Sequence, residues 1–217
     1  MTAGRIGAQA WVWDGVDDVM TVAAQAEINQ LAALSLSLWV NPTSAGEGSA
    51  GAIMDKRGAA ADGWSLVYDD LAGRTRCLRW RVDWDGGVLT VRTANNAVPA
   101  YNTGWYHVVL TWDGSLTATN VHIYVNGSEV GYQTQTNGIG NRVSDAAVAL
   151  LIGNESTQAS TFAGAMDHIR LFSHVLSPAE IASEYAAGAV TRRQYRRFQT
   201  ALPAWHAAVL PTVWRSR

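Results

Sequence analysis

Residues 105–127 read WYHVVLTWDGSLTATNVHIYVNG, and this stretch decides the fold. Its first part is rich in β-branched and aromatic residues, and Val108, Leu110 and Trp112 recur at a spacing of two. Because side chains alternate between the two faces of a strand, these three must share a face. The Asn126-Gly127 pair further along is the strongest short signal for a two-residue β-hairpin. The stretch therefore predicts neighbouring antiparallel strands.

The same pattern of short apolar or alternating segments, bounded by turn residues, continues on both sides. We expect strands at 10–13, 19–22, 35–41, 52–56, 64–68, 77–83, 88–93, 105–112, 122–125, 128–133, 150–153 and 164–172. The first two flank the loop 14–18 and are predicted to form a hairpin. Short, evenly spaced strands without intervening helices favour an antiparallel sandwich over an α/β fold.

One helix and a core can be predicted from local patterns. Ser177 and Glu180 have the spacing of a capping box, with Pro178 at the first helical position, which predicts a helix over 178–186 that stops at Gly188. Strand alternation predicts a sandwich core that includes Leu36, Leu38, Val40, Val108, Leu110, Trp112, Ile123, Val125, Ile169 and Leu171.

Charge divides the chain into two parts. The sequence has 16 basic and 18 acidic residues, and six arginines but no acid lie in 189–217. Residues 1–188 therefore carry 16 − 6 = 10 bases against 18 acids, a net charge of −8, and the remainder carries +6. We interpret residues 1–188 as one globular domain and residues 189–217 as a C-terminal arm with its own role.

Several classes of protein are disfavoured. No apolar run approaches the ~18 residues of a membrane-spanning helix, and the first 15 residues lack the apolar segment of a signal peptide. Cys77 is the single cysteine, so no internal disulfide can form. Hydrophobic residues make up 48% of the chain, which argues against disorder, and no cysteine–histidine cluster suggests zinc.

The arm combines arginines with apolar side chains that a solvated tail would not carry. Its candidate docking residues are Arg192, Arg193, Tyr195, Arg196, Arg197, Phe198, Leu202, Trp205, Leu210 and Trp214. Aromatic and arginine side chains dominate the energy of protein docking. We expect the arm to lie on another subunit, either a neighbouring copy or a shell protein; the alternative is that it folds back on its own domain. The absence of lysine and the interleaved aliphatic residues argue against nucleic acid as the partner.

Three groups of segments together resemble a known family. They are residues 13–19 (WDGVDDV), residues 36–42 (LSLWVNP) with 104–114 and 123–127, and residues 164–172 (GAMDHIRLF) with 176–181. In this order and spacing they resemble the laminin-G-like domains of the concanavalin A-like lectin/glucanase superfamily, over residues 8–188. The resemblance implies an all-β, antiparallel jelly-roll sandwich, here with one short helix near its end and the C-terminal arm. Function does not follow, because the superfamily is diverse.

The sequence gives no support for catalysis. Glycosidases of this superfamily place carboxylates on alternate residues of one strand, and no Glu-x-Asp-x-x-Glu pattern occurs. Asp83 and Asp85 do alternate, but they sit at a turn without a glutamate partner. There is no Gly-x-Ser-x-Gly elbow and no phosphate-binding loop. We expect the protein not to be an enzyme.

A structural calcium ion is the cofactor that the resemblance suggests. In laminin-G-like domains that bind calcium, the site commonly joins the N-terminal acidic hairpin to the last strand, which corresponds to Asp17 or Asp18 and Asp167 here. Carboxylate and loop carbonyl oxygens are the ligands of this hard cation. The alternative is that Asp17 and Asp18 form a polar turn and that Asp167 pairs with a backbone amide or an arginine.

Ten tryptophans are more than a core alone explains. Trp80 and Trp84 share one face of an extended stretch, with Arg79, Arg81 and Asp83 on the other. Aromatic side chains beside charged groups can stack on sugar rings. Trp64, Trp84 and Asp85, all next to glycine turns, are therefore the candidate ligand-binding residues, whereas most of the tryptophans are expected in the core.

These observations lead to a functional expectation and a rival. We expect a non-enzymatic structural or adhesive protein of a bacteriophage virion, a capsid decoration or tail component, which displays a lectin-like jelly roll and is anchored by its arm. Glycans are further candidate partners. The rival is a free or secreted, extracellular carbohydrate-binding module. A hydrolase with an unrecognised site is the third possibility.

Overall fold

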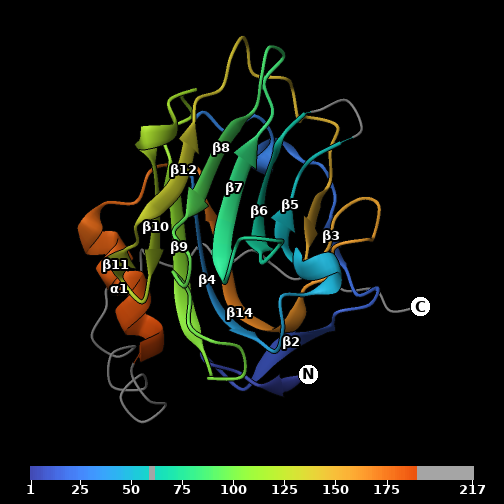
Figure 1. Cartoon of the computed structure of the whole chain (residues 1–217), viewed down its shortest axis with the longest axis vertical. Helices are drawn as coiled ribbons and strands as arrows, with labels where there is room; N and C mark the ends of the chain where they lie inside the picture. Colours follow the sequence, from blue (N-terminus) through green and yellow to red (C-terminus); the bar gives the residue numbers. More distant parts are fainter. Residues whose placement is uncertain (59–61, 190–217) are drawn as a thin grey trace.

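The alternating residues of the opening stretch form strand β9 (Tyr106–Trp112), which lies inside a sheet of seven strands. A computed structural model describes residues 1–58 and 62–189. These residues form two seven-stranded sheets, and each pair of neighbouring strands in them is antiparallel (Figure 1). The expected jelly-roll-like sandwich is confirmed.

The first sheet has the order β1 (Thr2–Ala3), β2 (Gln9–Asp14), β14 (Ala163–Phe172), β4 (Leu34–Pro42), β9, β10 (Val121–Val125) and β11 (Ser128–Glu129). The second has the order β12 (Tyr132–Thr136), β8 (Leu89–Thr93), β7 (Cys77–Val82), β6 (Trp64–Asp69), β5 (Ala52–Asp55), β13 (Leu150–Ile152) and β3 (Met20–Val22). Short 3-10 turns lie at Ala26–Ile28, Glu47–Ser49 and Ala118–Asn120.

The core fills the space between the two sheets. Eight of the ten predicted core residues are buried there, whereas Ile169 and Leu171 are half-buried at its margin, beyond a register shift in β14. Tryptophans from both sheets meet at the centre: Trp80 lies 5.3 Å from Trp64 and 6.0 Å from Trp112 between ring centroids. Most of the tryptophan excess in the described residues is therefore accounted for by packing.

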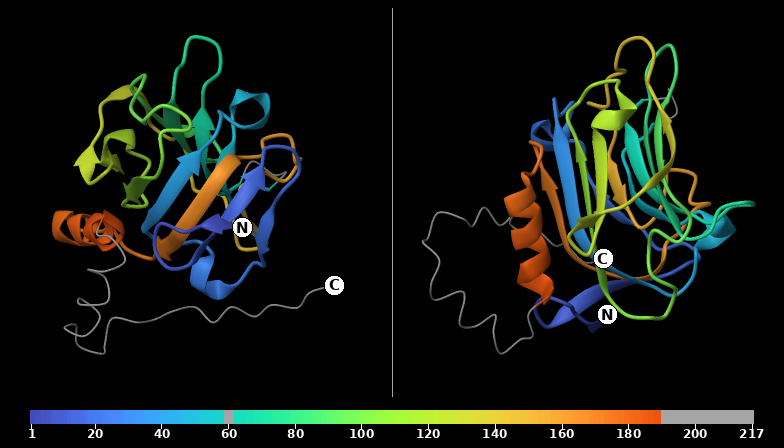
Figure 2. Two further views of the ribbon diagram at one scale, coloured as in Figure 1. Left: turned by 90° about the horizontal axis from the view of Figure 1, so that it is seen from below. Right: turned by 60° about the vertical axis from the view of Figure 1, so that its left-hand side comes forward.

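Helix α1 (Pro178–Ala189) covers the outer face of the first sheet and makes a third layer (Figure 2). The predicted capping box starts it: the Ser177 amide donates to Glu180 Oε2 at 2.8 Å, and the Glu180 amide donates to Ser177 Oγ at 3.3 Å. Gly188 does not stop the helix as predicted but lies within it. A Cβ atom at Gly188 would overlap the Trp39 indole, so glycine here allows the close approach of helix and sheet.

One predicted hairpin is wrong and one predicted strand is split, whereas the predicted hairpin at Asn126-Gly127 is confirmed by the pairing of β10 with β11. Strands β2 and β3 do not form a hairpin, because β2 pairs with β14 in the first sheet and β3 pairs with β13 in the second. The loop 15–19 instead crosses from one sheet to the other. The predicted strand 128–133 is likewise split, since β11 extends the first sheet and β12 the second. Turn residues mark where a chain reverses, but in a sandwich they do not specify the sheet that the next strand joins.

Candidate functional site

Alternate residues of β6, β7 and β8 point away from the core on the outer side of the second sheet. Their partners in the alternation, such as Trp80 and Leu66, point inward. Figure 1 looks onto this side, and Figure 2 shows that α1 lies on the other side of the sandwich, against the first sheet. We call this surface the arginine face and define it by Ser65, Val67, Asp69, Arg79, Arg81, Thr90 and Arg92.

Asp69 is the centre of the charge on the arginine face. Its buried carboxylate accepts hydrogen bonds from Arg92 Nε at 2.8 Å and from Arg74 Nη1 at 3.0 Å, and Arg79 Nε lies 3.8 Å away. Burial by itself would raise the pKa of Asp69, but the hydrogen bonds from Arg92 and Arg74 outweigh it and hold the pKa below its ordinary value. Asp69 is therefore a fixed anion that organises three guanidinium groups.

The other carboxylates around the face are also bound to arginines. Asp83 Oδ1 accepts from Arg81 Nε at 2.8 Å. Arg57 Nη2 donates to Asp55 at 2.8 Å and to Glu155 at 3.4 Å. Burial raises the pKa of Asp55 despite this partner. A glycosidase needs two carboxylates directed at one bond, whereas each carboxylate described here is directed at a guanidinium. The arrangement suits recognition better than catalysis.

The predicted ligand-binding residues do not form an exposed site. Trp64 is 0% exposed and points into the core, so its predicted exposure is wrong; the alternation of β6 places it inward with Leu66. Trp84 is half-buried, and Gly138 lies against its indole. Asp85 is exposed, but it accepts bonds from the Asn141 amide at 2.7 Å and Nδ2 at 3.2 Å. Trp84 and Asp85 therefore brace the β7–β8 turn.

The arginine face was missed although its signal lies in the sequence. The strand CLRWRV places Arg79 and Arg81 opposite the core-facing Trp80. The sequence-based prediction considered the tryptophan side of this strand as the surface for sugar rings, and the structure places Trp80 of that side in the core. What alternation could not reveal is that Arg92 and Arg74, from other segments, meet at Asp69.

The predicted calcium ligands are only partly brought together. Carboxylate oxygens of Asp14, Asp17 and Asp18 all lie within 4.8 Å of one another on the exposed crossing loop. Asp167 is not among them, because Ala163 is the β14 residue that pairs with Asp14. Asp167 lies four residues further along, about 13 Å at strand spacing, and accepts the Ile6 amide at 2.7 Å. The backbone-amide alternative holds for Asp167, whereas three clustered carboxylates fit a hard cation without it.

A buried serine and histidine lie between α1 and the first sheet. Ser37 Oγ lies 3.0 Å from His107 Nε2 and donates to Glu184 Oε2 at 3.0 Å. In a catalytic triad the carboxylate orients the histidine, but Glu184 bonds the serine instead. His107 is 0% exposed, and burial, with His168 nearby, lowers its pKa to about 4. The cluster is a structural contact between layers.

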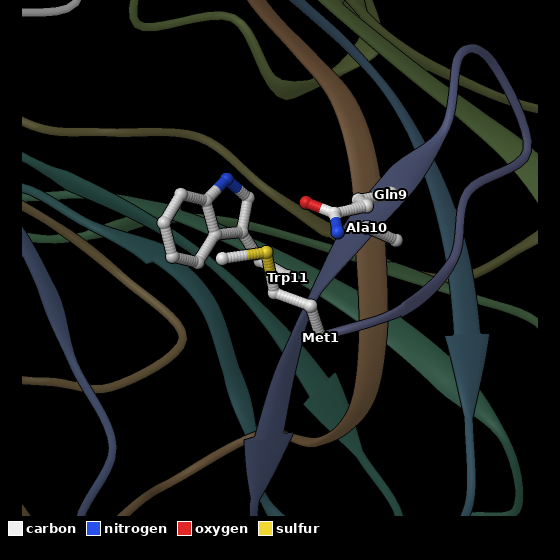
Figure 3. Close-up of a pocket in the computed structure, with 4 residues that line it drawn as sticks. All are labelled: Met1, Gln9, Ala10 and Trp11. Carbon is white, nitrogen blue, oxygen red and sulfur yellow. The ribbon is translucent and has the colours of Figure 1, made fainter.

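A shallow hollow lies at the edge of the first sheet, where Met1 and Trp11 lie side by side (Figure 3). Gln9 and Ala10 complete its lining, and none of the four lining residues has a charged side chain. The ten predicted docking residues of the arm, from Arg192 to Trp214, lie outside the described residues. None of the helices in residues 1–58 and 62–189 has the length and hydropathy of a membrane span.

A laminin-G profile, described as the Concanavalin A-like lectin/glucanases superfamily, matches residues 14–182, and the chain belongs to this family. No curated protein matches the sequence significantly.

Three of the solved structures that share the fold are a bacterial binding protein and two bacterial binding domains. The binding domain of Paraclostridial Mosquitocidal Protein 1 is 16% identical with a TM-score of 0.62, and the match covers 85% of this chain and 44% of that one. A Bacteroides ovatus protein assigned a carbohydrate-binding role is 16% identical with a TM-score of 0.56, covering 80% and 45%. The botulinum neurotoxin serotype D binding domain is 14% identical with a TM-score of 0.60, covering 84% and 44%. The chain thus spans less than half of each of these proteins.

Proposed function

We propose that the protein is a non-catalytic glycan-binding domain that holds its ligand on the arginine face. The observation that carries this proposal is a sheet surface that no helix covers, with partly exposed arginines as fixed hydrogen-bond donors, on a lectin-type fold. The carbohydrate-binding role assigned to the Bacteroides ovatus protein supports it. Guanidinium groups can donate to several sugar hydroxyls at once because their donors form a planar fork.

The composition of the arginine face also indicates how tightly it binds. Among the residues that define it, none is aromatic, so binding rests on hydrogen bonds rather than on ring stacking. A hydrogen bond contributes only about 0.5–1.5 kcal/mol net, somewhat more when a charge is involved. We therefore expect weak binding per site. Display of many copies on one surface would raise the avidity.

Affinity electrophoresis in gels that contain single polysaccharides tests the proposal. The parent should be retarded by at least one polysaccharide, with no cleavage products. Thr90→Ile, which removes a hydroxyl beside Arg81 in the sheet register, should be retarded less. Thr2→Ile, the same substitution on the first sheet, should behave as the parent. Equal retardation of both variants would contradict the site, and cleavage products would contradict the non-catalytic role.

We further propose that a calcium ion on Asp14, Asp17 and Asp18 braces the loop between the sheets. The ion would supply structural cross-linking, not chemistry. Running the same electrophoresis in calcium and in a chelator separates this loop from the arginine face, because the loop joins β2 to β3 whereas the arginine face lies on β6, β7 and β8. If the glycan affinity is lost when the chelator removes calcium, the ligand would lie at the loop instead.

A second candidate function is display on a particle, and the sequence of residues 189–217 favours it. Its net charge of +6 opposes the −8 of the rest of the chain, and its aromatic and arginine side chains suit docking. We propose that the arm anchors the jelly roll to a bacteriophage virion. The alternative is an extracellular, free carbohydrate-binding module.

Deleting the arm separates these two candidates. A chain that ends at Gly188 should keep its glycan retardation under either one. If the arm is the anchor, the truncated chain should also fail to incorporate into particles, and its mass in solution should be that of a monomer. Full incorporation of the truncated chain would show that the arm is not the anchor.

A further inference from the structure

The charges around Asp69 are not balanced. Three guanidinium groups, those of Arg74, Arg79 and Arg92, gather on this one carboxylate. Taken as +3 against −1, the cluster has two positive charges in excess. We call these four residues the Asp69 cluster.

Neighbouring acids offset only part of this excess. Asp83 is bonded to Arg81, whereas Asp55 and Glu155 share one guanidinium, that of Arg57. Asp70, next in sequence, accepts bonds from the Arg76 amide and the Tyr101 hydroxyl, and the Arg76 guanidinium donates to Asn96 Oδ1. Together these six arginines and five acids leave one positive charge in excess among the described residues, and three of the arginines gather at Asp69.

Among the described residues, Arg79 is the member of the cluster whose side chain makes no hydrogen bond. Its Nε is buried and has no hydrogen-bond partner among the described residues, and its distance of 3.8 Å from Asp69 Oδ2 is too long for one. Arg79 also lies directly opposite Arg92 in the β7–β8 register. Burial, together with the neighbouring guanidinium groups, lowers the pKa of Arg79. The side chain is nevertheless 28% exposed, so a ligand can reach it.

An incoming anion would offset the excess charge. Like charges in neighbouring strand positions are destabilising, and a negative group beside them reduces the repulsion. A carboxylate or sulfate on the surface would accept hydrogen bonds from Arg79 and neutralise the excess charge. Arginine is suited to this because its planar fork can bind such groups through two parallel hydrogen bonds.

We propose that the Asp69 cluster binds the anionic group of an acidic glycan, with Arg79 as the residue that contacts it. This inference rests on the proposed glycan-binding function and narrows it to polymers that carry carboxylates or sulfates. The cluster discriminates against neutral glycans because their hydroxyl groups can accept hydrogen bonds but leave the excess positive charge unbalanced.

Calorimetric titration with matched polymers tests the proposal. Polygalacturonate is compared with its methyl ester, which has the same sugar without the charge, and dextran sulfate is compared with dextran. The parent should bind at least one anionic polymer about tenfold more tightly than its neutral counterpart, and added salt should weaken this binding. The two pairs tell whether a carboxylate or a sulfate is the preferred anion.

Arg79→Gln is the decisive variant, and Arg5→Gln is its control. Both remove one positive charge, but Arg5 lies over Trp39 on the outer side of the first sheet. Arg79→Gln should bind the anionic polymer about tenfold more weakly with an unchanged or higher melting temperature, because it removes an unpaired donor. Arg5→Gln should bind as the parent does. Arg74→Gln, which leaves Arg92 on Asp69, provides a second variant of the same cluster.

Three results would overturn the inference. Equal binding of an anionic polymer and its neutral counterpart would show that charge is not recognised. Equal loss in Arg79→Gln and Arg5→Gln would show that only net charge matters. Binding of neutral glycans alone would leave the proposed function standing without this inference, whereas no binding to any glycan would remove both.

Discussion

Replacing Trp80 with alanine is expected to lower the free energy of unfolding by about 3–5 kcal/mol, the range for large aromatic residues removed from a core. Trp80 is 0% exposed and lies between Trp64 of the same sheet and Trp112 of the opposite sheet. Its removal would leave a cavity that the rigid strands on both sides cannot close. Urea unfolding followed by circular dichroism measures the change.

Trp80→Phe is the matched control for this substitution. Trp80 Nε1 is buried without a hydrogen-bond partner among the described residues. Phenylalanine keeps an aromatic ring and removes this donor, so part of the cavity cost is offset. We expect a clearly smaller loss of stability than for alanine. If Trp80→Ala unfolds at the same urea concentration as the parent, the tryptophan-centred core is wrong.

Acid should destabilise the protein through His107, by about 3 kcal/mol between pH 6.5 and pH 4. The pKa of His107 is lowered to about 4 by burial, with a contribution from His168. In this pH range the unfolded chain binds a proton that the folded His107 does not, so stability is full above the unfolded pKa and is lost as the pH falls. Because α1 lies over His107, we expect the helix layer to be affected.

His107→Gln isolates this effect from other acid-sensitive groups. Glutamine keeps a hydrogen-bonding group near Ser37 but does not titrate. His168, whose pKa burial also lowers, stays in both proteins and cancels in the comparison. The free energy of unfolding, measured from pH 7 to pH 4, should therefore decrease less with falling pH for the variant than for the parent. Parallel pH profiles would contradict the role of His107.

Local patterns predicted the elements of the fold well. The spacing of Val108, Leu110 and Trp112 predicted a strand and its core face, and the capping box of Ser177 and Glu180 predicted the start of the helix. Both signals are physical constraints within a few residues. The pairing of β2 and β3 was predicted wrongly because the partner of a strand is decided by distant segments.

The candidate site shows the same limit. Exposure of Trp64 was inferred from the glycine turn beside it, yet the alternation of β6 places its indole in the core. Asp167 matched a family motif, but its register in β14 takes it away from Asp17 and Asp18. The arginines that meet at Asp69 come from β7, β8 and the preceding turn. Because these segments are separate in the sequence, their meeting at Asp69 could not be predicted from local patterns.

The central claim, that the arginine face binds a glycan, can be tested most directly by nuclear magnetic resonance. Backbone amide and arginine Nε–H signals of the labelled full chain would be followed during titration with the oligosaccharide of the best-bound polymer. The largest shifts should fall on β6, β7 and β8 and include the Nε–H of Arg79. Largest shifts at the acidic loop 14–18 or around Met1 and Trp11, with β6–β8 unchanged, would contradict the claim.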